Sequence, residues 1–594
     1  MFKLLKNLKF KDFVLVIVAV ALIVLQVALE LKIPDFTRNL TEIVQSGTMT
    51  GTANMSDVWK NGGLMLACAA GSLFSAVICT FLLSRVASSF SKTLRDKLYE
   101  KISTFSEAEM KKFSVPSLIT RTTNDVVQMQ NFMAMGIQLV FKAPIMAVWA
   151  ILKISETNIK WTIAVAVSVV LIVVGVVILT RVVFPRFKRI QKLTDEINTV
   201  TRESVSGVRV VRAFGAEDFQ EQKFDEVNKK ITNNHLVTSR TLGLMNPMMN
   251  LVMNGLMLAI YWIGAVLVNQ IVFSGDVQAM IIERGALVGS TAAFTSYAMQ
   301  VVMSFMMLIM IFIVLPRTLV SAKRILEVLE TQPSIVEGCF NGEPENHGTI
   351  EFKNVSFSYA DSENAERAIA DVSFKVATGE TLAIIGATGS AKSTLIKLIP
   401  RFHDATQGTV LVDGVCVKDY REEVLNSKIA FAAQKAVLFK GTIRDNIALG
   451  SEIVDDEKIK EALRIAQADF VFELEKGLDS EVAQGGTNFS GGQKQRLSIA
   501  RALYKNAEII IFDDTFSALD YKTDMLVRSA IHENLAGKTI VIVAQRIGTI
   551  KDADQILVLD EGKVVGKGTH KELLENCALY KEIALSQLSK EELE

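Results

Sequence analysis

Six long apolar stretches in the first half of the chain constrain its fold more strongly than any other feature. A helix needs about 20 mostly apolar residues to cross a bilayer, and the sequence supplies this length at residues 13–31, 62–83, 135–154, 161–184, 248–268 and 291–315. A buried core helix could explain one such stretch, but six of them in one half of a chain indicate transmembrane helices. We therefore expect an α-helical membrane domain with six transmembrane helices, in contact with the lipid bilayer.

Lysine and arginine residues indicate how these helices cross the membrane. They gather between the second and third stretches, as at Arg95 and Lys112, and between the fourth and fifth, as at Arg189 and Arg209. Basic loops stay on the cytoplasmic side, so we expect both termini and both basic segments in the cytoplasm. The lysine-rich Phe2–Lys11 segment is then a retained cytoplasmic lead-in rather than a signal peptide.

The two basic segments are each about 50–60 residues long and contain few glycines or prolines. Apolar side chains recur in them at helical spacing, as at Leu94, Leu98 and Ile102. Because a structureless loop of that length is unusual, we predict helices that continue well beyond the membrane. The sequence places their turn-backs near Phe113–Asp125 and Phe214–Phe219.

The apolar bias ends near residue 316, although the chain as a whole is 50% hydrophobic. The remainder has the composition of an ordinary soluble α/β domain. We predict a membrane domain at residues 1–330, a linker at 331–338 and a soluble domain at 339–594. The net charge of zero gives no basic field that would attract nucleic acid, and the five cysteines are scattered without a disulfide or metal-site pattern.

A few polar side chains interrupt the apolar stretches, namely Gln138, Lys142, Asn250, Asn254 and Gln300. Such groups avoid lipid and usually face a cavity or a partner helix. For Lys142 two interpretations stay open: it lines a path through the domain, or it extends to the membrane surface. Methionines crowd the fifth and sixth stretches, which fits a broad hydrophobic substrate site as well as ordinary packing.

The soluble part contains a pattern typical of phosphate binding. The apolar run Thr381–Gly386 predicts a buried strand, and it leads through a loop rich in Gly and Ser to Lys392, Ser393 and an apolar helix. In this strand–loop–helix context the backbone N–H groups cradle phosphates, the lysine reaches the β- and γ-phosphates and the serine binds Mg²⁺. The pattern has a glycine just before the lysine, whereas this chain has Ala391, whose methyl group is expected to crowd the loop.

Two further segments strengthen this interpretation. A second apolar run, Ile509–Phe512, ends in Asp513, which is the carboxylate that a Mg²⁺ ion beside the phosphates requires. About 20 residues earlier, Phe489 is followed by Ser490-Gly491-Gly492-Gln493 and a helical segment. An SGGQ run alone is a weak signal, but between a phosphate loop and an Asp-tipped strand it is a specific one.

With these motifs the chain resembles ATP-binding cassette (ABC) transporters, and in particular exporter halves that fuse a membrane domain to an α/β P-loop cassette. The membrane part matches at residues 118–126 and 206–214, which in the family lead to the coupling helices. The resemblance implies ATP and Mg²⁺ as cofactors, and two cassettes that pair head to tail around each nucleotide. It assigns nucleotide contacts to Tyr359, Gly386, Thr388, Gly389, Ser390, Ala391, Lys392, Ser393, Thr394 and Gln434. Ser490, Gly491, Gly492, Gln493 and Asp520 act across the pair, and Ser393, Gln434 and Asp513 hold Mg²⁺.

Two departures from the family pattern fall on catalytic positions. Asp514 replaces the glutamate that polarises the attacking water, and Gln545 replaces the histidine that contacts the γ-phosphate. Glutamine cannot carry charge or shuttle protons at neutral pH. The Ser490–Gln493 segment, by contrast, keeps the family pattern. This asymmetry resembles the degenerate-site subunit of bacterial heterodimeric multidrug exporters.

We therefore expect an ATP-hydrolysing exporter subunit in the cell membrane, multi-pass, with a cytoplasmic nucleotide-binding domain. Its predicted partner is a different exporter half with an intact glutamate and histidine, and its predicted cargo is a small hydrophobic or amphipathic compound, as in multidrug efflux. Two alternatives stay open: half of a peptide or lipid exporter, or a low-turnover homodimeric ATP-gated regulator or channel. Nucleic acid is not an expected partner.

Overall fold

The computed structural model describes residues 2–6, 8–50, 55–155, 159–271, 277–359 and 367–588. Its contacts divide the chain into two compact units. The first comprises Met1–Ile102 and Pro116–Thr331, and the second comprises Ser103–Val115 and Gln332–Glu594. The short segment Ser103–Val115 therefore packs with the C-terminal part of the chain, although it lies inside the predicted membrane domain.

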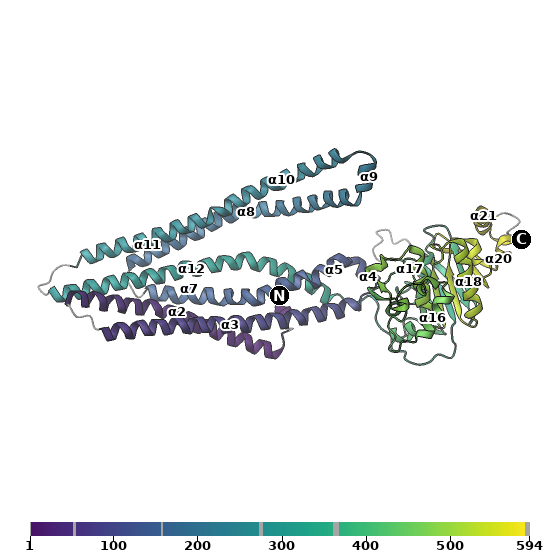
Figure 1. Cartoon of the computed structure of the whole chain (residues 1–594), viewed down its shortest axis with the longest axis horizontal. Helices are drawn as coiled ribbons and strands as arrows, with labels where there is room; N and C mark the ends of the chain where they lie inside the picture. Colours follow the sequence, from purple (N-terminus) through teal and green to yellow (C-terminus); the bar gives the residue numbers. More distant parts are fainter. Residues whose placement is uncertain are drawn as a thin grey trace. The chain divides into compact units, whose positions relative to one another are not determined.

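The first unit is entirely helical in its described residues (Figure 1). Its helices are α1 (Phe2–Leu5), α2 (Phe10–Thr50), α3 (Met55–Ser103), α5 (Val115–Thr122), α6 (Asn124–Asn131), the π-helical turn Phe132–Gly136, α7 (Ile137–Ser155), α8 (Ile159–Ser206), α9 (Val208–Ala213), α10 (Glu217–Gly243), α11 (Met245–Asn269) and α12 (Val277–Glu330). Among the described residues, six helical segments are long and apolar enough to cross a membrane, and each includes one of the stretches predicted from sequence. The six-helix prediction is confirmed.

These helices pack through a narrow apolar core. Helix α12 lies against α2 and α7, and α8 lies against α10 and α11. In the core, the rings of Trp161 and Phe294 lie 5.1 Å apart, and both side chains are almost fully buried. Many other apolar side chains point outward, such as Leu66 with 74% exposed and Val170 with 59% exposed. Exposed apolar surface on this scale marks contact with lipid or with another chain.

The long helices continue beyond their apolar stretches and turn back through short helices. One turn is α9; the other is α4 (Glu107–Phe113) of the second unit. Both begin earlier than the sequence predicted. Ser106 is the N-cap of α4: its side chain accepts a hydrogen bond from the Glu109 backbone N–H, and the Glu109 carboxylate accepts one from the Ser106 backbone N–H, which together form a capping box. Ser114, whose φ is +57°, is the C-cap.

Helix α4 is held within the second unit by a carboxylate. Glu107 lies 3.0 Å from the Lys397 ammonium and 3.3 Å from Nε2 of His403. Burial alone would raise the pKa of Glu107, but hydrogen bonds and charge from Lys397 and Lys111 outweigh it and lower the pKa to about 2. Glu107 therefore stays ionised throughout the physiological range and keeps α4 tied to the segment that follows the phosphate loop.

The second unit is an α/β domain. Its strands are β1 (Ile350–Phe357), β2 (Ile369–Val376), β3 (Thr381–Gly386), β4 (Gln407–Val412), β5 (Val415–Cys416), β6 (Ile429–Ala432), β7 (Gly441–Thr442), β8 (Glu481–Val482), β9 (Ile509–Asp513), β10 (Thr539–Val543), β11 (Gln555–Asp560) and β12 (Lys563–Gly568). Its remaining helices are α13 (Lys392–Ile396), α14 (Glu422–Lys428), α15 (Ile443–Ile447), α16 (Asp456–Ile465), α17 (Gly491–Tyr504), α18 (Tyr521–Asn534), α19 (Ile547–Ile550), α20 (His570–Asn576) and α21 (Ala578–Gln587). The predicted architecture, a helical membrane domain followed by an α/β domain, is confirmed.

A six-stranded sheet in the order β12-β11-β3-β10-β9-β6 forms the centre of this unit, and a separate antiparallel sheet has the order β2-β1-β4-β5. Strands β11, β3, β10, β9 and β6 are parallel. Every residue of β9 and β10 is buried, which suits their continuous runs of Ile and Val. In open sheets of this kind ligands bind beyond the carboxyl ends of the strands, and β3, β10 and β9 end there side by side.

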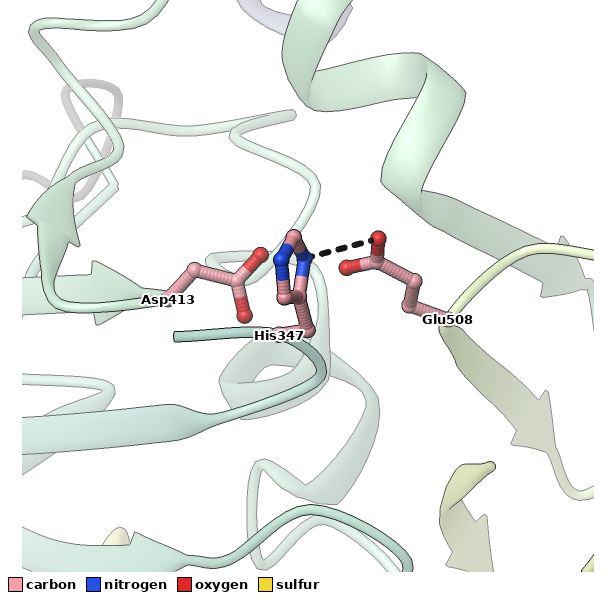
Figure 2. Close-up of side chains that lie close together, drawn as sticks. All are labelled: His347, Asp413 and Glu508. Atoms are coloured by element: carbon pink, nitrogen blue, oxygen red, sulfur yellow. Dashed lines mark hydrogen bonds and ion pairs between the residues drawn. The ribbon is translucent and has the colours of Figure 1, made fainter. Parts of the chain in front are cut away.

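Away from that edge, three side chains distant in sequence meet in the second unit (Figure 2). His347, Asp413 and Glu508 bring their polar atoms within 4.8 Å of one another. These are side-chain types that also bind metals, but here a lysine supplies the positive charge: Nζ of Lys428 lies 2.9 Å from Asp413 and 3.1 Å from Glu508. We interpret the group as a charge cluster that ties α14 to β4 and to the start of β9.

Replacing Lys428 by methionine is expected to destabilise the second unit by about 3–5 kcal/mol, because it leaves the Asp413 carboxylate buried without its cation. The Asp413 side chain is fully buried and that of Lys428 is 10% exposed. Burial disfavours the ammonium, but hydrogen bonds and charge from Asp413 and Glu508 raise the pKa of Lys428 above its usual value. Thermal unfolding of the purified chain measures the effect.

The matched control is Lys458→Met, because Lys458 forms an exposed pair with Asp455 at 3.7 Å. An exposed pair contributes at most about 1 kcal/mol, so this variant should unfold almost as the parent does. Adding Asp413→Asn to Lys428→Met should recover part of the loss. Equal stability of the Lys428 and Lys458 variants would contradict the interpretation.

Candidate functional site

A cavity of about 790 Å³ opens at the carboxyl ends of the central strands. It is lined by Tyr359, Arg367, Ala368, Thr388, Gly389, Ala391, Lys392, Ser393, Thr394, Gln434, Asp514, Val543, Gln545, Glu561 and Gly562. Ten of the residues expected at the nucleotide or in catalysis are therefore brought together from loops after β1, β3, β6, β9 and β10. The fold places them at one edge because the strands that carry them are parallel neighbours.

The loop after β3 has the shape of an anion cradle. It reaches α13 through Gly389, with φ +90°, and Ala391, with φ +68°. Nζ of Lys392 donates 2.8 Å hydrogen bonds to the carbonyl oxygens of Gly386 and Ala387, which folds the lysine across the loop. Burial lowers the pKa of Lys392, although the charges of Asp514 and Asp513 oppose this. A phosphate would offer the buried ammonium a closer counter-charge than the carbonyl groups do.

Ala391 occupies a backbone conformation that favours glycine. Its φ of +68° and ψ of 23° are left-handed, which costs an alanine about 1–2 kcal/mol. The crowding that the sequence predicts concerns bound phosphates and stays a prediction; in the structure Ala391 packs against the apolar core below the loop. The cost therefore arises from the backbone conformation.

We expect Ala391→Gly to raise the stability of the nucleotide-free second unit by about 0.5–1 kcal/mol, because glycine adopts left-handed backbone without strain. Thermal unfolding of the purified chain without nucleotide measures this change. Ala387→Gly is the control within the same loop, since Ala387 has no positive φ. Glycine there relieves no strain and raises the conformational entropy of the unfolded chain, so that variant should be less stable. Stabilisation by both substitutions, or by neither, would contradict the strain argument.

Ser393 and Asp513 meet beside the loop as the sequence predicted. Ser393 Oγ donates a 2.7 Å hydrogen bond to Asp513 Oδ1, and Asp513 is only 4% exposed. Burial raises the pKa of Asp513 despite the hydrogen bond from Ser393 and the charge of Lys397. A hydroxyl and a carboxylate oxygen at one point are ligands that suit Mg²⁺, so this pair fits the predicted ion, which would neutralise phosphate charge.

Asp514 is the meeting point of three separate loops. Its Oδ2 accepts a 3.0 Å hydrogen bond from Gln434 Nε2 and a 2.8 Å bond from Gln545 Nε2. The residue is 7% exposed and has a φ of +46°. The role of Gln434 at Mg²⁺ and the γ-phosphate stays a prediction; in this structure its amide donates to the Asp514 carboxylate. The two positions that depart from the family pattern, Asp514 and Gln545, thus bond directly to each other.

Tyr359 forms the aromatic part of the cavity. Its hydroxyl lies 3.0 Å from Thr394 Oγ1, and its ring packs edge-on with Phe357, at 4.9 Å between centroids. Nζ of Lys111, from α4, lies 4.8 Å from the centre of the Tyr359 ring. The ring is therefore fixed in position before any base stacks on it.

Comparison with known proteins identifies the family of the chain. The family model for the ABC transporter transmembrane region matches residues 16–291, and the family model described as ABC transporter matches residues 369–517. An uncharacterized ABC transporter ATP-binding protein of Mycobacterium tuberculosis (strain CDC 1551 / Oshkosh) is 38% identical over 557 residues, which cover 92% of each chain. The chain belongs to the ABC transporter family.

Other relatives agree with this assignment. The ABC transporter ATP-binding protein YfiB of Bacillus subtilis (strain 168) is 33% identical over 97% of this chain and 96% of its own length. An ATP-dependent lipid A-core flippase of Pseudomonas fluorescens (strain Pf0-1) is 31% identical over 87% of this chain and 84% of its own length. In fold, the chain is similar to a bacterial Atm1-family ABC exporter solved with ATP bound, with a TM-score of 0.77, 24% identity, and coverage of 97% and 99% of the two chains.

This ABC transporter chain is thus a multi-pass membrane protein with the exporter fold, whose second unit is an ATP-binding domain. ABC transporters of this type hydrolyse ATP and work as dimers in a membrane. The dimer matters for the remaining predicted residues. Ser490, Gly491, Gly492, Gln493 and Asp520 are not among the residues that line the cavity of this chain, and their action across a pair stays a prediction.

The SGGQ segment has the local geometry of a helix start. Ser490 caps α17: its Oγ accepts from the Gln493 backbone N–H at 3.3 Å, and the Gln493 side chain accepts from the Ser490 N–H at 2.9 Å. Asp520 caps α18 in a similar way through Thr523. The first N–H groups of α17, at Gly491 and Gly492, stay available for an anion.

Sequence reasoning missed five residues of the cavity, namely Arg367, Ala368, Val543, Glu561 and Gly562. Glu561 and Gly562 form the tight turn between β11 and β12, and the Gly562 carbonyl accepts from the Ala370 N–H at 2.9 Å. The turn lies beside the phosphate loop because β11 pairs with β3, and no local sequence motif predicts this pairing. The Asp-Glu-Gly run at residues 560–562 is a signal for a tight turn, but it does not show what the turn lies beside. Gly386, Ser390 and Asp513 are not part of the lining but contact residues that are. The Gly386 carbonyl and Ser390 Oγ accept hydrogen bonds from Lys392, and Asp513 accepts one from Ser393.

Proposed function

We propose that this chain is one half of a heterodimeric ATP-driven exporter, with a degenerate ATP site on its own phosphate loop. Its partner is a different ABC exporter half with an intact catalytic glutamate and histidine. The observation that carries the proposal is the pairing of Asp514 with Gln545 at 2.8 Å. The two family positions that manage the attacking water and the γ-phosphate are both altered, and here they satisfy each other.

The chemistry of this pair favours ATP retention over hydrolysis. A carboxylate at the glutamate position must reach and polarise water, yet Asp514 is one methylene shorter and its Oδ2 already accepts two amide hydrogen bonds. Gln545 can donate a hydrogen bond but cannot carry positive charge. Positioned acid–base help contributes about 10²–10⁴-fold, and a misplacement of about 1 Å costs about 10²-fold. We expect slow hydrolysis at this site.

In this proposal the chain nevertheless completes the active site of its partner. The capped start of α17 offers Ser490 Oγ and the N–H groups of Gly491 and Gly492 to a γ-phosphate held by the partner's phosphate loop. Ser393, Asp513 and Gln434 would hold Mg²⁺ on this chain's own side. The Ser490–Gln493 segment, which we call the signature segment, therefore functions only when two chains pair. ATP hydrolysis takes place mainly at the site on the partner's phosphate loop.

For the cargo we propose hydrophobic or amphipathic compounds, as in multidrug efflux, moved out across the cell membrane. The basic loops support cytoplasmic termini and a cytoplasmic nucleotide-binding domain, and the methionine-rich α11 and α12 support a broad apolar site. A lipid exporter is the second candidate, because relatives of about 31% identity are lipid A-core flippases.

The deciding experiment is purification of the tagged chain from its native membranes in mild detergent, followed by identification of any stoichiometric companion. The proposal expects a second, different exporter half with glutamate and histidine at the matching positions, and loss of ATPase activity when that glutamate is replaced. Recovery of this chain alone, as a homodimer with brisk ATPase activity, would overturn it. A homodimer with little turnover would favour the gated regulator or channel instead.

A further inference from the structure

A group of polar side chains from four helices meets inside the membrane domain. Oε1 of Glu30, on α2, accepts hydrogen bonds from Gln26 Nε2 at 2.8 Å and from Ser72 Oγ, on α3, at 3.2 Å. The Lys142 ammonium, on α7, lies 3.0 Å from the same oxygen. Gln300, on α12, donates to the Glu30 backbone carbonyl at 3.4 Å. We call these five residues the Glu30 network.

The network bears on the two interpretations of Lys142, which either lines a path through the domain or extends to the membrane surface. Its side chain is only 14% exposed, and its charge is paired with Glu30 inside the domain instead of extending to the membrane surface. A second pair, Lys153 with Asp35 at 3.3 Å, joins the same two helices further along. Helices α2 and α7 are thus held in a fixed register by two ion pairs.

The network lies well within the apolar part of the domain. Ser72, Lys142 and Gln300 each fall inside a predicted membrane-spanning stretch, several residues from its ends. Glu30 is one residue before the end of the first predicted stretch, but the apolar helical segment that carries it continues to Gln45. Ionisable side chains at this depth are costly, and they mark the path of a substrate or ion in most membrane proteins.

The hydrogen bonds of the network are unbalanced. Oε1 of Gln26 and Oε1 of Gln300 are buried and accept no hydrogen bond from the residues that the structure describes. Gln26 is 5% exposed, so the group is buried in the protein. Both free positions are acceptors, and both belong to residues that contact Glu30. The donors of the network point to the side chain and the backbone carbonyl of Glu30, so a further N–H donor is what the two glutamine oxygens would accept.

We propose that the Glu30 network binds the ammonium group of an organic cation that carries N–H donors on an apolar body. The N–H groups would satisfy the two glutamine oxygens, while the positive charge shares Glu30 with Lys142. An anionic headgroup would add acceptors where two already lack donors. A quaternary ammonium has the charge but no N–H group to donate. The inference rests on the proposed export function and names the class of its cargo.

The test compares two probes that differ only at nitrogen, decylammonium and decyltrimethylammonium. Binding to the full-length assembly in lipid nanodiscs is measured by equilibrium dialysis without nucleotide, and binding to empty nanodiscs of the same lipid is subtracted. The parent protein should bind decylammonium about 10-fold more tightly, since hydrogen bonds to a charged donor discriminate strongly. The double variant Gln26→Met/Gln300→Met should lose this preference.

Gln138→Met is the matched control, because Gln138 lies on α7 one turn before Lys142 and is not one of the five residues of the Glu30 network; it should keep the 10-fold preference. Equal affinity of the parent for both amines would overturn the proposal, and so would a preference that survives in the double variant. A lower unfolding temperature with an unchanged preference would assign the glutamines to packing alone. Because dialysis does not depend on ATP turnover, a failure of the proposed degenerate site leaves this measurement unaffected.

Discussion

Replacing Asp514 by glutamate and Gln545 by histidine together is expected to raise ATP hydrolysis at this chain's own site by at least about 10²-fold. Glutamate adds the methylene that brings the carboxylate to the attacking water, and histidine restores a group that can be charged beside the γ-phosphate. The variant also breaks the 2.8 Å bond that now joins the two side chains. Activity is measured in the assembled transporter after the partner's phosphate-loop lysine has been replaced.

Single substitutions separate the two contributions. Asp514→Glu alone should give a smaller gain, because Gln434 and Gln545 can still donate to the longer carboxylate. Asp514→Asn is the matched control: it keeps the shape of the side chain, removes the charge and should give no gain. Unchanged activity of the double variant, with ATP still bound, would contradict the view that these two residues limit hydrolysis at this site.

Local sequence patterns sufficed for the parts of the fold that depend on short segments. The apolar length of each membrane helix, the run Thr381–Gly386 and the Asp-tipped run ending at Asp513 are local features, and the structure has a helix or a strand at each. Apolar length and strand burial follow directly from composition. The family pattern then placed Tyr359, Gln434 and Gln545 at the same cavity.

Long-range packing was not available from the sequence. The turn at Glu561–Gly562 reaches the cavity because β11 pairs with β3, and Glu30 lies beside Lys142 because α2 packs against α7. The sequence named Lys142 and Gln300 as unusual but gave no partner for either. It also could not show that Gln434 bonds Asp514, since that contact depends on the relative reach of three loops.

Gly491→Asp is expected to abolish at least about 99% of the ATPase activity of the assembled transporter while leaving this chain folded. An added Cβ at Gly491 meets no atom within 4 Å, and an aspartate in the first turn of α17 is favourable for the helix itself. The aspartate carboxylate would, however, occupy the proposed position of the γ-phosphate that the partner's loop holds, and the two negative charges would repel each other at close range. ATPase activity and thermal unfolding are measured on the same preparation.

The contrast with Lys392→Ala makes this prediction specific to a heterodimer. Lys392 belongs to this chain's own phosphate loop, so its loss should remove ATP binding there but leave most of the turnover, which the partner's loop carries. In a homodimer each chain supplies both a loop and a signature segment, and both substitutions would stop hydrolysis. Gly548→Asp, which also adds a side chain into open space near a helix start, is the control for the charge itself and should stay active. Loss of activity with Gly491→Asp and retention with Lys392→Ala would place the productive site on the partner's loop. At that site Gly491 of this chain contacts the nucleotide and Lys392 does not, so the two substitutions have different effects on hydrolysis.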